Sequence, residues 1–280
     1  MCNRYLKKRD VITIAKSRVP LIIGGFVVVG VLAALGYGYT RYQAQSTAAS
    51  ATPAPAHWTY EGEEGPANWG KLDPAYTLCS DGSAQTPIDI VNPVKKDIVD
   101  PVFGYQKGAV GIVNNGHTIQ AVAAAGNTIT LDGQVFTLAQ MHFHAPSEHA
   151  INGKKSAIEA HFVHKNSAGK LAVVGVMIDE GSSDNAAWEP FVQSLTTVKG
   201  TDGTATLDWG QLLPTSTLTY QYTGSLTTPP CSEGVHWVLM QTPVQLSARQ
   251  IAAFTAAYNG NDRPIQPVGN REVDVDVSGN

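Results

Sequence analysis

Two short stretches of this sequence place histidines at alternate positions beside amide or acidic side chains. The first is Gln140-Met-His-Phe-His144 and the second is Glu159-Ala-His161. Three neutral imidazoles with an open fourth position are the ligand set of a catalytic zinc. A His-x-His pair alone is weak evidence, because strand histidines usually have a structural role and a motif needs its context. The second stretch supplies the third imidazole and strengthens the prediction of a metal site.

These histidines need a strand to position them. A β-branched and aromatic run precedes the first stretch and predicts a strand that continues through it. Side chains alternate between the two faces of a strand, so Gln140, His142 and His144 should share one face. Met141 and Phe143 should then point to the other face, into apolar packing. The first stretch therefore predicts two ligands on one side of a sheet.

A second strand is expected over residues 157–164, after the turn at Asn152-Gly153. Glu159 and His161 share a face there, and a neighbouring strand about 4.8 Å away could bring His161 to the same ion. His164 lies on the opposite face and is interpreted as structural. Gln140 and Glu159 are placed to accept hydrogen bonds from the outer imidazole nitrogens.

The composition indicates one β-rich domain. The chain has 280 residues, 43% hydrophobic and 15% charged, and many short β-prone segments are separated by Gly, Pro and Asn. Residues 57–280 carry 12 Lys and Arg against 22 Asp and Glu, a net charge of −10. An acidic body without a basic stripe offers nothing to a phosphate backbone, so nucleic acid is excluded as the expected partner.

The N-terminal residues indicate export. Residues 19–40 form a run of 22 uncharged positions, long enough to cross a bilayer as a helix, and six basic residues precede it. We expect residues 1–40 to be a cytoplasmic basic segment followed by a signal peptide or membrane anchor. Residues 41–56, rich in Ala, Ser, Thr and Pro, are expected to be a linker to a domain over residues 57–280. The predicted location is the periplasm, and whether residues 19–40 are cleaved or remain in the inner membrane is left open.

Two cysteines beyond Cys2 agree with export. Cys79 and Cys231 each lie beside turn-forming residues, and in an oxidising compartment they would pair. Two unrelated buried thiols are the alternative that the residues alone leave open.

Two peripheral helices are predicted. Ser247 and Gln250 form a capping-box pattern ahead of an apolar face, and Asn259-Gly260 provides a stop. A second helix is expected over residues 184–195, although Pro190 falls inside it.

The motifs together resemble the zinc-binding core of the α-class carbonic anhydrases, and of their bacterial exported branch. The similarity covers roughly 215 residues, by motif order alone. The matching stretches are His57-Trp-x-Tyr60, Gly65-Pro66, Gln85-Thr-Pro-Ile-Asp89, Asn114-Asn-Gly-His117, Gln140-x-His-Phe-His-x-Pro-Ser-Glu-His149, Glu159-Ala-His-Phe-Val-His164, Gly224-Ser-Leu-Thr-Thr-Pro-Pro230 and Arg263-Pro-Ile-Gln-Pro267. The resemblance implies Zn²⁺ at His142, His144 and His161, and a disulfide between Cys79 and Cys231. It also implies a single domain around a central, mostly antiparallel twisted β-sheet with short peripheral helices.

The resemblance also implies roles for individual side chains. Glu148 and Thr227 match the pair that orients a zinc-bound hydroxide, although each alone would be interpreted as a loop or turn residue. His117 matches the proton shuttle, against the alternative of an exposed turn histidine. The remaining matches are to the family's substrate-binding positions. They are Thr228 and a hydrophobic wall made of Val163, Val173, Leu226 and Trp237.

The expected function is therefore the zinc-dependent, reversible hydration of carbon dioxide to bicarbonate and a proton. The expected partners are carbon dioxide and bicarbonate, with the membrane or the export machinery at the N-terminal segment; a homodimer is left open. One alternative is a non-catalytic module of the same family, but such modules lose a zinc histidine and here all three are present. The other is a Ser-His-Asp hydrolase, for which the Gly-x-Ser-x-Gly elbow is missing.

Overall fold

The computed structural model describes residues 56–197 and 203–278, and strands dominate them. The strands are β1 (Asp89–Ile90), β2 (Val94–Lys96), β3 (Val102–Gly104), β4 (Lys107–Asn114), β5 (Ile119–Val122), β6 (Thr128–Leu131), β7 (Gln134–His144), β8 (Ala150–Ile151), β9 (Ile158–Lys165), β10 (Leu171–Gly181), β11 (Gly203–Asp208), β12 (Thr219–Ser225), β13 (Glu233–Met240), β14 (Val244–Ser247) and β15 (Asp274–Asp276). The helices are α2 (Trp69–Leu72), α3 (Leu78–Asp81), α4 (Glu189–Thr197) and α5 (Ala248–Ala257), with short 3₁₀ turns η1 (Gly62–Glu64), η2 (Pro74–Tyr76) and η3 (Trp209–Leu212).

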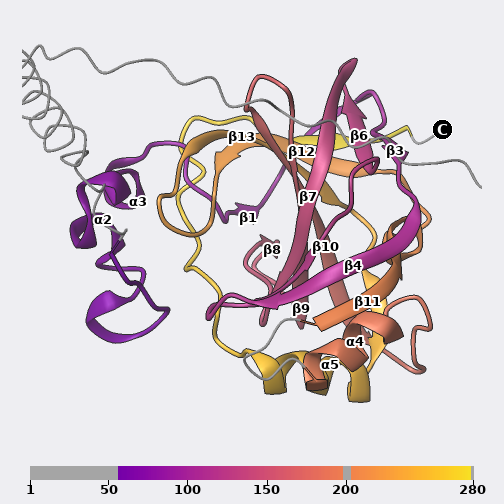
Figure 1. The fold of residues 1–280 in the computed structure, drawn as a ribbon. Helices are drawn as coiled ribbons and strands as arrows, with labels where there is room; N and C mark the ends of the chain where they lie inside the picture. The colour runs from indigo at the N-terminus through magenta and orange to yellow at the C-terminus, as the bar shows by residue number, and fades with distance from the viewer. Residues whose placement is uncertain (1–55, 198–202, 279–280) are drawn as a thin grey trace, which may run out of the picture. The chain divides into compact units, whose positions relative to one another are not determined.

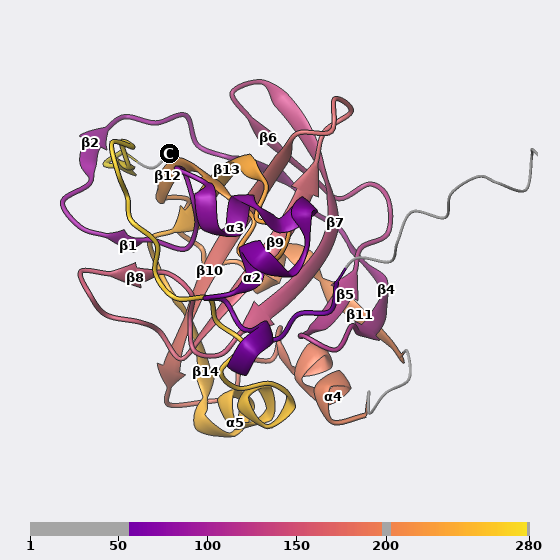
Figure 2. The ribbon, with the colours of Figure 1, turned by 90° about the vertical axis from the view of Figure 1, so that its left-hand side faces the viewer.

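Thirteen of the described strands form one twisted sheet (Figures 1 and 2). Its main path runs β11-β4-β5-β7-β9-β10-β13-β12-β15-β2, with β3, β6 and β14 added at its sides. The pairs are antiparallel except β10 with β13, β10 with β14, and β15 with β2. The predicted β-rich domain, with a mostly antiparallel twisted sheet and short helices around it, is confirmed.

Strands β7 and β9 lie at the centre of this sheet and pair antiparallel. A β-bulge at Ala139 shifts the register, so that Leu138 faces His164 before it and Gln140 faces Val163 after it. Beyond the bulge, the three polar side chains Gln140, His142 and His144 share one face, as predicted.

The opposite face of β7 packs into the main apolar core. Met141 and Phe143 are fully buried in this core, which confirms their predicted orientation. Phe143 contacts Phe254 of α5 edge-on, with ring centroids 4.8 Å apart, and Phe191 of α4 with centroids 6.4 Å apart. Figure 1 shows the two helices next to each other at one end of the sheet. The helices therefore brace the back of the strand that carries two of the histidines.

Helix α5 starts as the sequence predicts and α4 does not. Ser247 caps α5: its Oγ accepts the backbone N–H of Gln250, and Oε1 of Gln250 accepts the backbone N–H of Ser247. The predicted capping box is confirmed. Helix α4 begins at Glu189, five residues after the predicted start. Pro190 explains the correction, because proline is tolerated in the first turn of a helix but not in its interior.

A disulfide joins Cys79 to Cys231 across 152 residues of sequence, as predicted. Cys79 lies in α3, and Cys231 ends the turn that follows Thr227 and Thr228. In the chain-entropy model, closing a loop of this length stabilises the folded state by roughly 5 kcal/mol. The bond therefore fixes the N-terminal part of the domain to the loop that carries Thr227.

The predicted N-terminal segments lie outside the described residues, apart from Ala56. Among the residues that the structure describes, none of the helices has the length and apolar character needed to cross a membrane.

His164, on the apolar face of β9, makes the stability of the fold depend on pH. The side chain is fully buried, with Nε2 2.7 Å from the hydroxyl of Tyr105. Burial lowers the pKa of His164 from 6.5 to about 4. In the unfolded chain His164 binds a proton as the pH falls through 6.5, whereas in the folded protein it does so only near pH 4. The free energy of unfolding therefore decreases as the pH falls between these two values.

We predict that His164→Gln flattens this dependence. Between pH 7.5 and 5 the wild-type protein should lose about 2 kcal/mol more unfolding free energy than the variant, because the variant lacks the buried base. Urea unfolding at both pH values measures the difference, and the other histidines, common to both proteins, cancel. An equal loss in the two proteins would show that His164 does not resist protonation.

Candidate metal centre and active site

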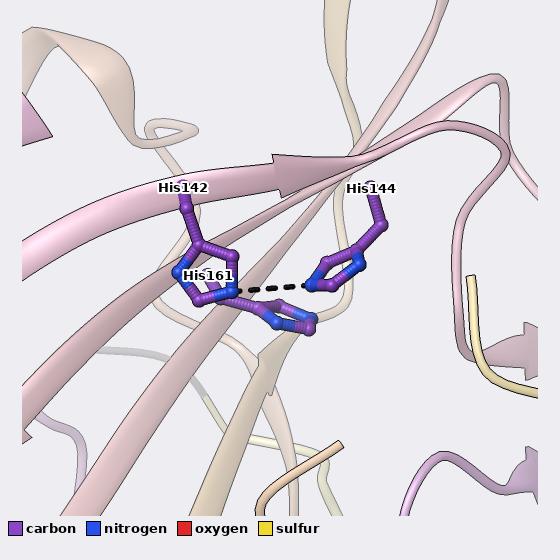
Figure 3. A group of neighbouring side chains, drawn as sticks. All are labelled: His142, His144 and His161. Carbon is purple, nitrogen blue, oxygen red and sulfur yellow. Dashed lines mark hydrogen bonds between the residues drawn. The ribbon is translucent and has the colours of Figure 1, made fainter. Parts of the chain in front are cut away.

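Three imidazoles converge on one face of the sheet. His142 and His144 extend from β7, and His161 lies directly opposite His142 on β9. The Nε2 atoms of His142 and His144 are 3.1 Å apart, and one ligand atom from each of the three rings lies within 4.8 Å of the others. Figure 3 shows the three rings turned toward a common point. The spacing suits a single metal ion.

The outer nitrogen of each ring is held by an oxygen acceptor. The acceptors are Gln140 Oε1 for His142 Nδ1 (2.9 Å), the Asn261 carbonyl for His144 Nδ1 (2.7 Å) and Glu159 Oε1 for His161 Nε2 (2.9 Å). Because these outer nitrogens carry the N–H, the lone pairs are Nε2 of His142 and His144 and Nδ1 of His161. Gln140 and Glu159 lie where the sequence predicts, whereas Asn261 was not foreseen.

Burial favours the neutral form of these rings. It is the largest cause that lowers the pKa of His142, His144 and His161. A neutral imidazole is the form that binds a metal. Three such nitrogens lining a cavity, with no thiolate grouped with them in the described residues, fit a catalytic zinc rather than a closed structural site.

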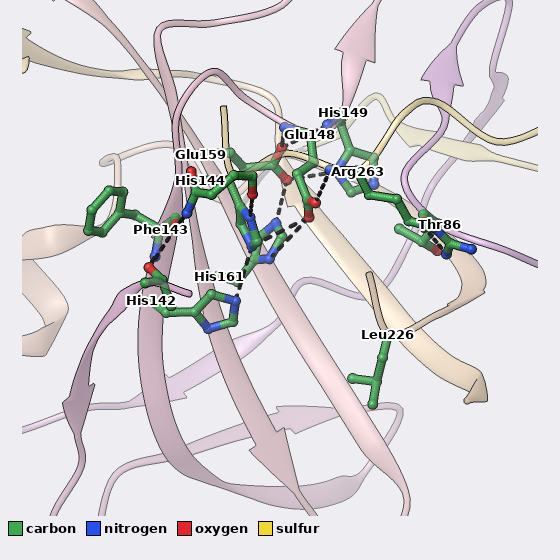
Figure 4. A network of polar contacts seen from close by, with 12 residues as sticks. Thr86, His142, Phe143, His144, Glu148, His149, Glu159, His161, Leu226 and Arg263 are labelled. Atoms are coloured by element: carbon green, nitrogen blue, oxygen red, sulfur yellow. Dashed lines mark hydrogen bonds and ion pairs between the residues drawn. The ribbon is translucent and has the colours of Figure 1, made fainter. Parts of the chain in front are cut away.

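Glu159 is held rigidly behind His161. Its Oε2 accepts the backbone N–H groups of Glu148 (2.9 Å) and His149 (2.8 Å), and its Oε1 lies 2.6 Å from His149 Nδ1. Burial alone would raise the pKa of Glu159, but His149 and His161 bring it well below the ordinary value. His149 Nε2 is in turn 2.6 Å from the Tyr222 hydroxyl. Figure 4 shows part of this network, which fixes the His161 ring from behind.

Glu148 contributes a buried oxygen close to two of the three imidazoles, His144 and His161. Its Oε1 accepts the Arg263 backbone N–H (2.8 Å), while Oε2 lies 3.4 Å from His144 Nε2 and satisfies no hydrogen-bond geometry within the described residues. Burial raises the pKa of Glu148 to about 7, opposed by His161, the Arg263 amide and the Thr227 hydroxyl. A buried carboxylate oxygen without a hydrogen-bond partner calls for an explanation. A metal ion with a water ligand would supply one, if a side-chain hydroxyl linked that water to the Glu148 carboxylate.

The side chain of Arg263 fixes the position of its own backbone N–H, which donates to Glu148. Its guanidinium is almost fully buried and lies over the Trp69 ring, with Cζ 5.8 Å from the ring centroid. In the part of the chain that the structure describes, it donates to three neutral acceptors: Gln85 Oε1 (2.9 Å), the Thr86 carbonyl (2.8 Å) and the Cys79 carbonyl (3.0 Å). The carboxylate is therefore anchored through Arg263 to the segment that the disulfide holds.

The histidines lie in a cavity of about 300 Å³ with one apolar and one polar side. The apolar lining is Val163, Leu171, Val173, Leu226 and Trp237, and the polar lining includes Tyr60, Asn115, His117, Gln120, Thr227 and Thr228. All four residues predicted to form the hydrophobic wall, and Thr228, line this cavity. Leu171 and Trp58 also line the cavity. Neither was assigned to it from the sequence, because an apolar residue on a strand or in a loop has no distinctive pattern, and the matched stretch His57-Trp-x-Tyr60 did not by itself place Trp58 at the site.

His117 lies at the polar side, in the turn between β4 and β5. The Asn115 Oδ1 accepts its backbone N–H at 2.9 Å. Its ring stacks on Trp58, with centroids 3.6 Å apart and planes 7° apart. Burial, and then the charge of His57, lower the pKa of His117. The structure thus brings the predicted shuttle residue to the same cavity as the three imidazoles.

Comparisons with known proteins agree with this geometry. A family model described as eukaryotic-type carbonic anhydrase matches residues 64–277. A carbonic anhydrase of Pectobacterium carotovorum is 43% identical over 227 residues, which are 80% of this chain and 92% of that protein. One of Pectobacterium atrosepticum is 42% identical over 219 residues, 77% of this chain and 89% of that protein. The structure of an α-carbonic anhydrase from Thermovibrio ammonificans in complex with the inhibitor sulfanilamide matches with a TM-score of 0.76 and 41% identity, covering 79% of this chain and all of that one.

Proposed function

Because this chain belongs to the eukaryotic-type family of carbonic anhydrases, and is therefore a lyase that hydrates carbon dioxide, we propose that it does so with a zinc ion held by His142, His144 and His161. One observation carries the proposal: three imidazole nitrogens with fixed tautomers converge at the floor of a cavity that has an apolar wall. When bound, zinc lowers the pKa of a water ligand to about 7, a value that was measured for carbonic anhydrase itself and is adopted here.

Glu148 and Thr227 orient the nucleophilic oxygen. A hydroxyl has one proton to donate and two lone pairs to accept with, so Thr227 can donate to Glu148 and accept from the nucleophile at the same time. Glu148 leaves Oε2 free for this hydrogen bond, since Oε1 is occupied by the Arg263 amide. The lone pair of the nucleophile is thereby aimed at the substrate.

The apolar wall receives the carbon dioxide. Val163, Val173, Leu226 and Trp237 line one side of the cavity beside the histidines, and an apolar gas gains from displacing water there. Thr228 also lines the cavity, and its hydroxyl can donate a hydrogen bond to a substrate oxygen. Attack on carbon then gives bicarbonate, and regeneration of the nucleophile releases one proton.

His117 carries that proton out of the cavity. An imidazole titrates near neutral pH, and the His117 ring lies between the cavity and the solvent. The polar side chains of Tyr60, Asn115 and Gln120 line the same cavity as His117 and the three imidazoles. They can order water molecules that connect the site of the reaction to His117.

We predict that His117→Ala lowers kcat by about 10-fold or more at low buffer concentration, because a general acid–base group is removed from the proton step. kcat/KM should stay nearly unchanged, since it reports events up to bicarbonate release. Imidazole-type buffers should restore much of the loss. Stopped-flow hydration at several buffer concentrations measures both constants, and a wild-type kcat at low buffer would leave His117 as a turn residue.

Removal of the metal tests the proposed function directly. The purified protein should bind about one zinc per chain, lose carbon dioxide hydration on chelation and recover it when zinc is added back, because the three imidazoles have no other means to generate the nucleophile. Far-ultraviolet circular dichroism should stay the same in the metal-free protein. Hydration that persisted without metal would contradict the proposal.

We also propose that the catalytic domain works outside the cytoplasm. The uncharged run at residues 19–40 and the basic residues before it support export. The disulfide between Cys79 and Cys231 suits an oxidising compartment.

A further inference from the structure

The two side chains proposed to orient the nucleophile, Glu148 and Thr227, come from two separate loops. Glu148 lies between β7 and β8. Thr227 lies between β12 and β13, in a turn that the Cys231 N–H closes by donating to the Thr228 carbonyl (2.8 Å). Both Glu148 and Thr227 are buried. Because the loops share no strand or helix, the separation of the two side chains must be fixed from outside them.

Gln85 lies between these two loops. It begins the matched stretch Gln85-Thr-Pro-Ile-Asp89, to which the proposed mechanism gives no role, and it is 4% exposed. Its Oε1 accepts from the Arg263 guanidinium (2.9 Å), while its Nε2 donates to the Cys231 carbonyl (3.1 Å) and to Oε1 of Glu233 (3.0 Å). Because a guanidinium only donates and a carbonyl or carboxylate oxygen only accepts, these partners fix the orientation of the amide.

Arg263 connects Gln85 to the carboxylate of Glu148. Its backbone N–H donates to Glu148 Oε1 (2.8 Å), and its guanidinium donates to Gln85 and to the Thr86 carbonyl (2.8 Å). Figure 4 shows Arg263 beside Glu148, with Thr86 at the far end of its side chain. One residue thus holds the carboxylate with its main chain and residues 85 and 86 with its side chain.

Thr86 ties the same segment to the start of the turn that carries Thr227. The Thr86 N–H donates to Ser225 Oγ (3.0 Å), and the Ser225 N–H donates to Thr86 Oγ1 (2.9 Å). A Cβ at residue 224 would lie 2.1 Å from Thr86 Oγ1, so Gly224 allows the close approach of the two chains. Residues 85 and 86 therefore hold both ends of the turn, Thr86 through Ser225 and Gln85 through the Cys231 carbonyl.

We propose that Gln85 is a positioning residue, which together with Arg263 sets the separation of Glu148 and Thr227 and thereby the direction of the nucleophile. The inference rests on the proposed function. A continuous path joins the two side chains from behind: Glu148 bonds to the Arg263 amide, Arg263 to Gln85, and Gln85 to the turn of Thr227. A primary amide is needed at residue 85, because it offers an acceptor to the guanidinium and donors to the Cys231 carbonyl and the Glu233 carboxylate.

The kinetic test uses Gln85→Met in the full, zinc-loaded protein. Methionine is also unbranched and lacks the amide. The variant should keep its zinc and lower kcat/KM for hydration by about 10-fold, part of the 10²-fold that a misplacement of about 1 Å can cost. Added imidazole buffer should not restore the rate, because the attack on carbon is affected rather than the removal of the proton. A substitution that only destabilised the fold would leave kcat/KM per bound zinc unchanged.

Gln241→Met is the matched control. This half-buried glutamine also donates from its amide to two carbonyls, those of Thr219 (3.0 Å) and Asp276 (2.8 Å), but it does not line the cavity of the three imidazoles, so the control should keep the wild-type kcat/KM. In the double variant of Gln85→Met with Thr227→Ala, kcat/KM should equal that of Thr227→Ala alone, because Gln85 acts only through the orienting pair.

A second readout needs neither zinc nor activity. In native-state hydrogen exchange of the zinc-free protein, Gln85→Met should speed exchange of the Arg263 and Cys231 amides by about 10-fold or more, because both bonds open locally once the link is lost. The amides of the central strands β7 and β9 should keep their wild-type rates. Gln85→Glu, a second variant, keeps the acceptor for Arg263 and loses both donors, so it should speed exchange at Cys231 and leave Arg263 protected.

Three results would each overturn the role of Gln85: a wild-type kcat/KM in Gln85→Met, a multiplied loss in the double variant, or unchanged exchange at both amides. A wild-type protein that did not hydrate carbon dioxide would instead overturn the proposed function. The exchange experiment would then still decide whether Gln85 holds the two loops together.

Discussion

Replacing His161 with alanine is expected to remove zinc and carbon dioxide hydration together. Three imidazoles supply all the predicted protein ligands, and two cannot hold the ion in the geometry that a catalytic zinc needs. The variant also loses the acceptor–imidazole pair with Glu159, which fixes the ligand nitrogen. The loss of zinc affinity should therefore exceed the 10–100-fold of an outer hydrogen-bond change, and hydration should fall by about 100-fold or more. His142→Ala and His144→Ala should behave alike.

The measurement pairs zinc content after dialysis with stopped-flow hydration. His236→Ala is the matched control, because this half-buried histidine on β13 bonds to Gln221 outside the cavity and should keep both zinc and activity. Glu159→Gln provides an intermediate case with zinc affinity lowered by about 10–100-fold. If a ligand variant kept both zinc and activity, that residue would not be a ligand.

The ligand side chains were predictable because side chains on a strand alternate between its two faces, and here the polar and apolar residue types alternate in the same way. Gln140, His142 and His144 alternate with buried apolar residues, and Glu159 and His161 do the same on the next strand. The register that places His142 opposite His161 was not predicted. It depends on pairing between strands, and period-two alternation alone does not choose one register among several that keep the same faces.

The bulge at Ala139 left a signal that was available in the sequence. Phe136 and Leu138 are in the main core, and so are Met141 and Phe143. The buried positions therefore change from even to odd numbers along one strand, which is what a single extra residue produces. A regular strand would have brought Leu138 to the same face as Gln140.

The contribution of Asn261 could not be found in this way. Its backbone carbonyl accepts from His144 Nδ1, 117 residues away in sequence, and its side chain bonds to the Ala145 amide, the Phe143 carbonyl and the His117 carbonyl. A carbonyl belongs to every residue type and leaves no mark on the sequence. The residues alone indicated that Cys79 and Cys231 could pair but left two free thiols open. The roles of Thr227 and Glu148 depended on the family resemblance, because a threonine or a glutamate in a turn has no distinctive pattern.

Thr227→Ala is expected to lower kcat and kcat/KM together by about 100-fold, the cost of misplacing reacting atoms by about 1 Å. The variant removes the hydroxyl that links the nucleophilic oxygen to Glu148, while the zinc ligands and their acceptors stay in place. Zinc content should therefore be unchanged. Added imidazole buffer should not restore the rate, because the attack on carbon is affected rather than the removal of the proton.

Thr227→Ser is the control that separates chemistry from packing. Serine retains the hydroxyl and loses only a methyl group, so most of the activity should return. Glu148→Gln should resemble Thr227→Ala, because an amide oxygen can still accept from the Arg263 N–H but the amide nitrogen then faces Thr227 and cannot accept its proton. Since the two side chains act on the nucleophile as one hydrogen-bonded pair, the double variant should be little worse than either single one. Multiplied losses in the double variant, or a Thr227→Ala protein with wild-type kcat/KM, would show that Thr227 and Glu148 do not orient the nucleophile together.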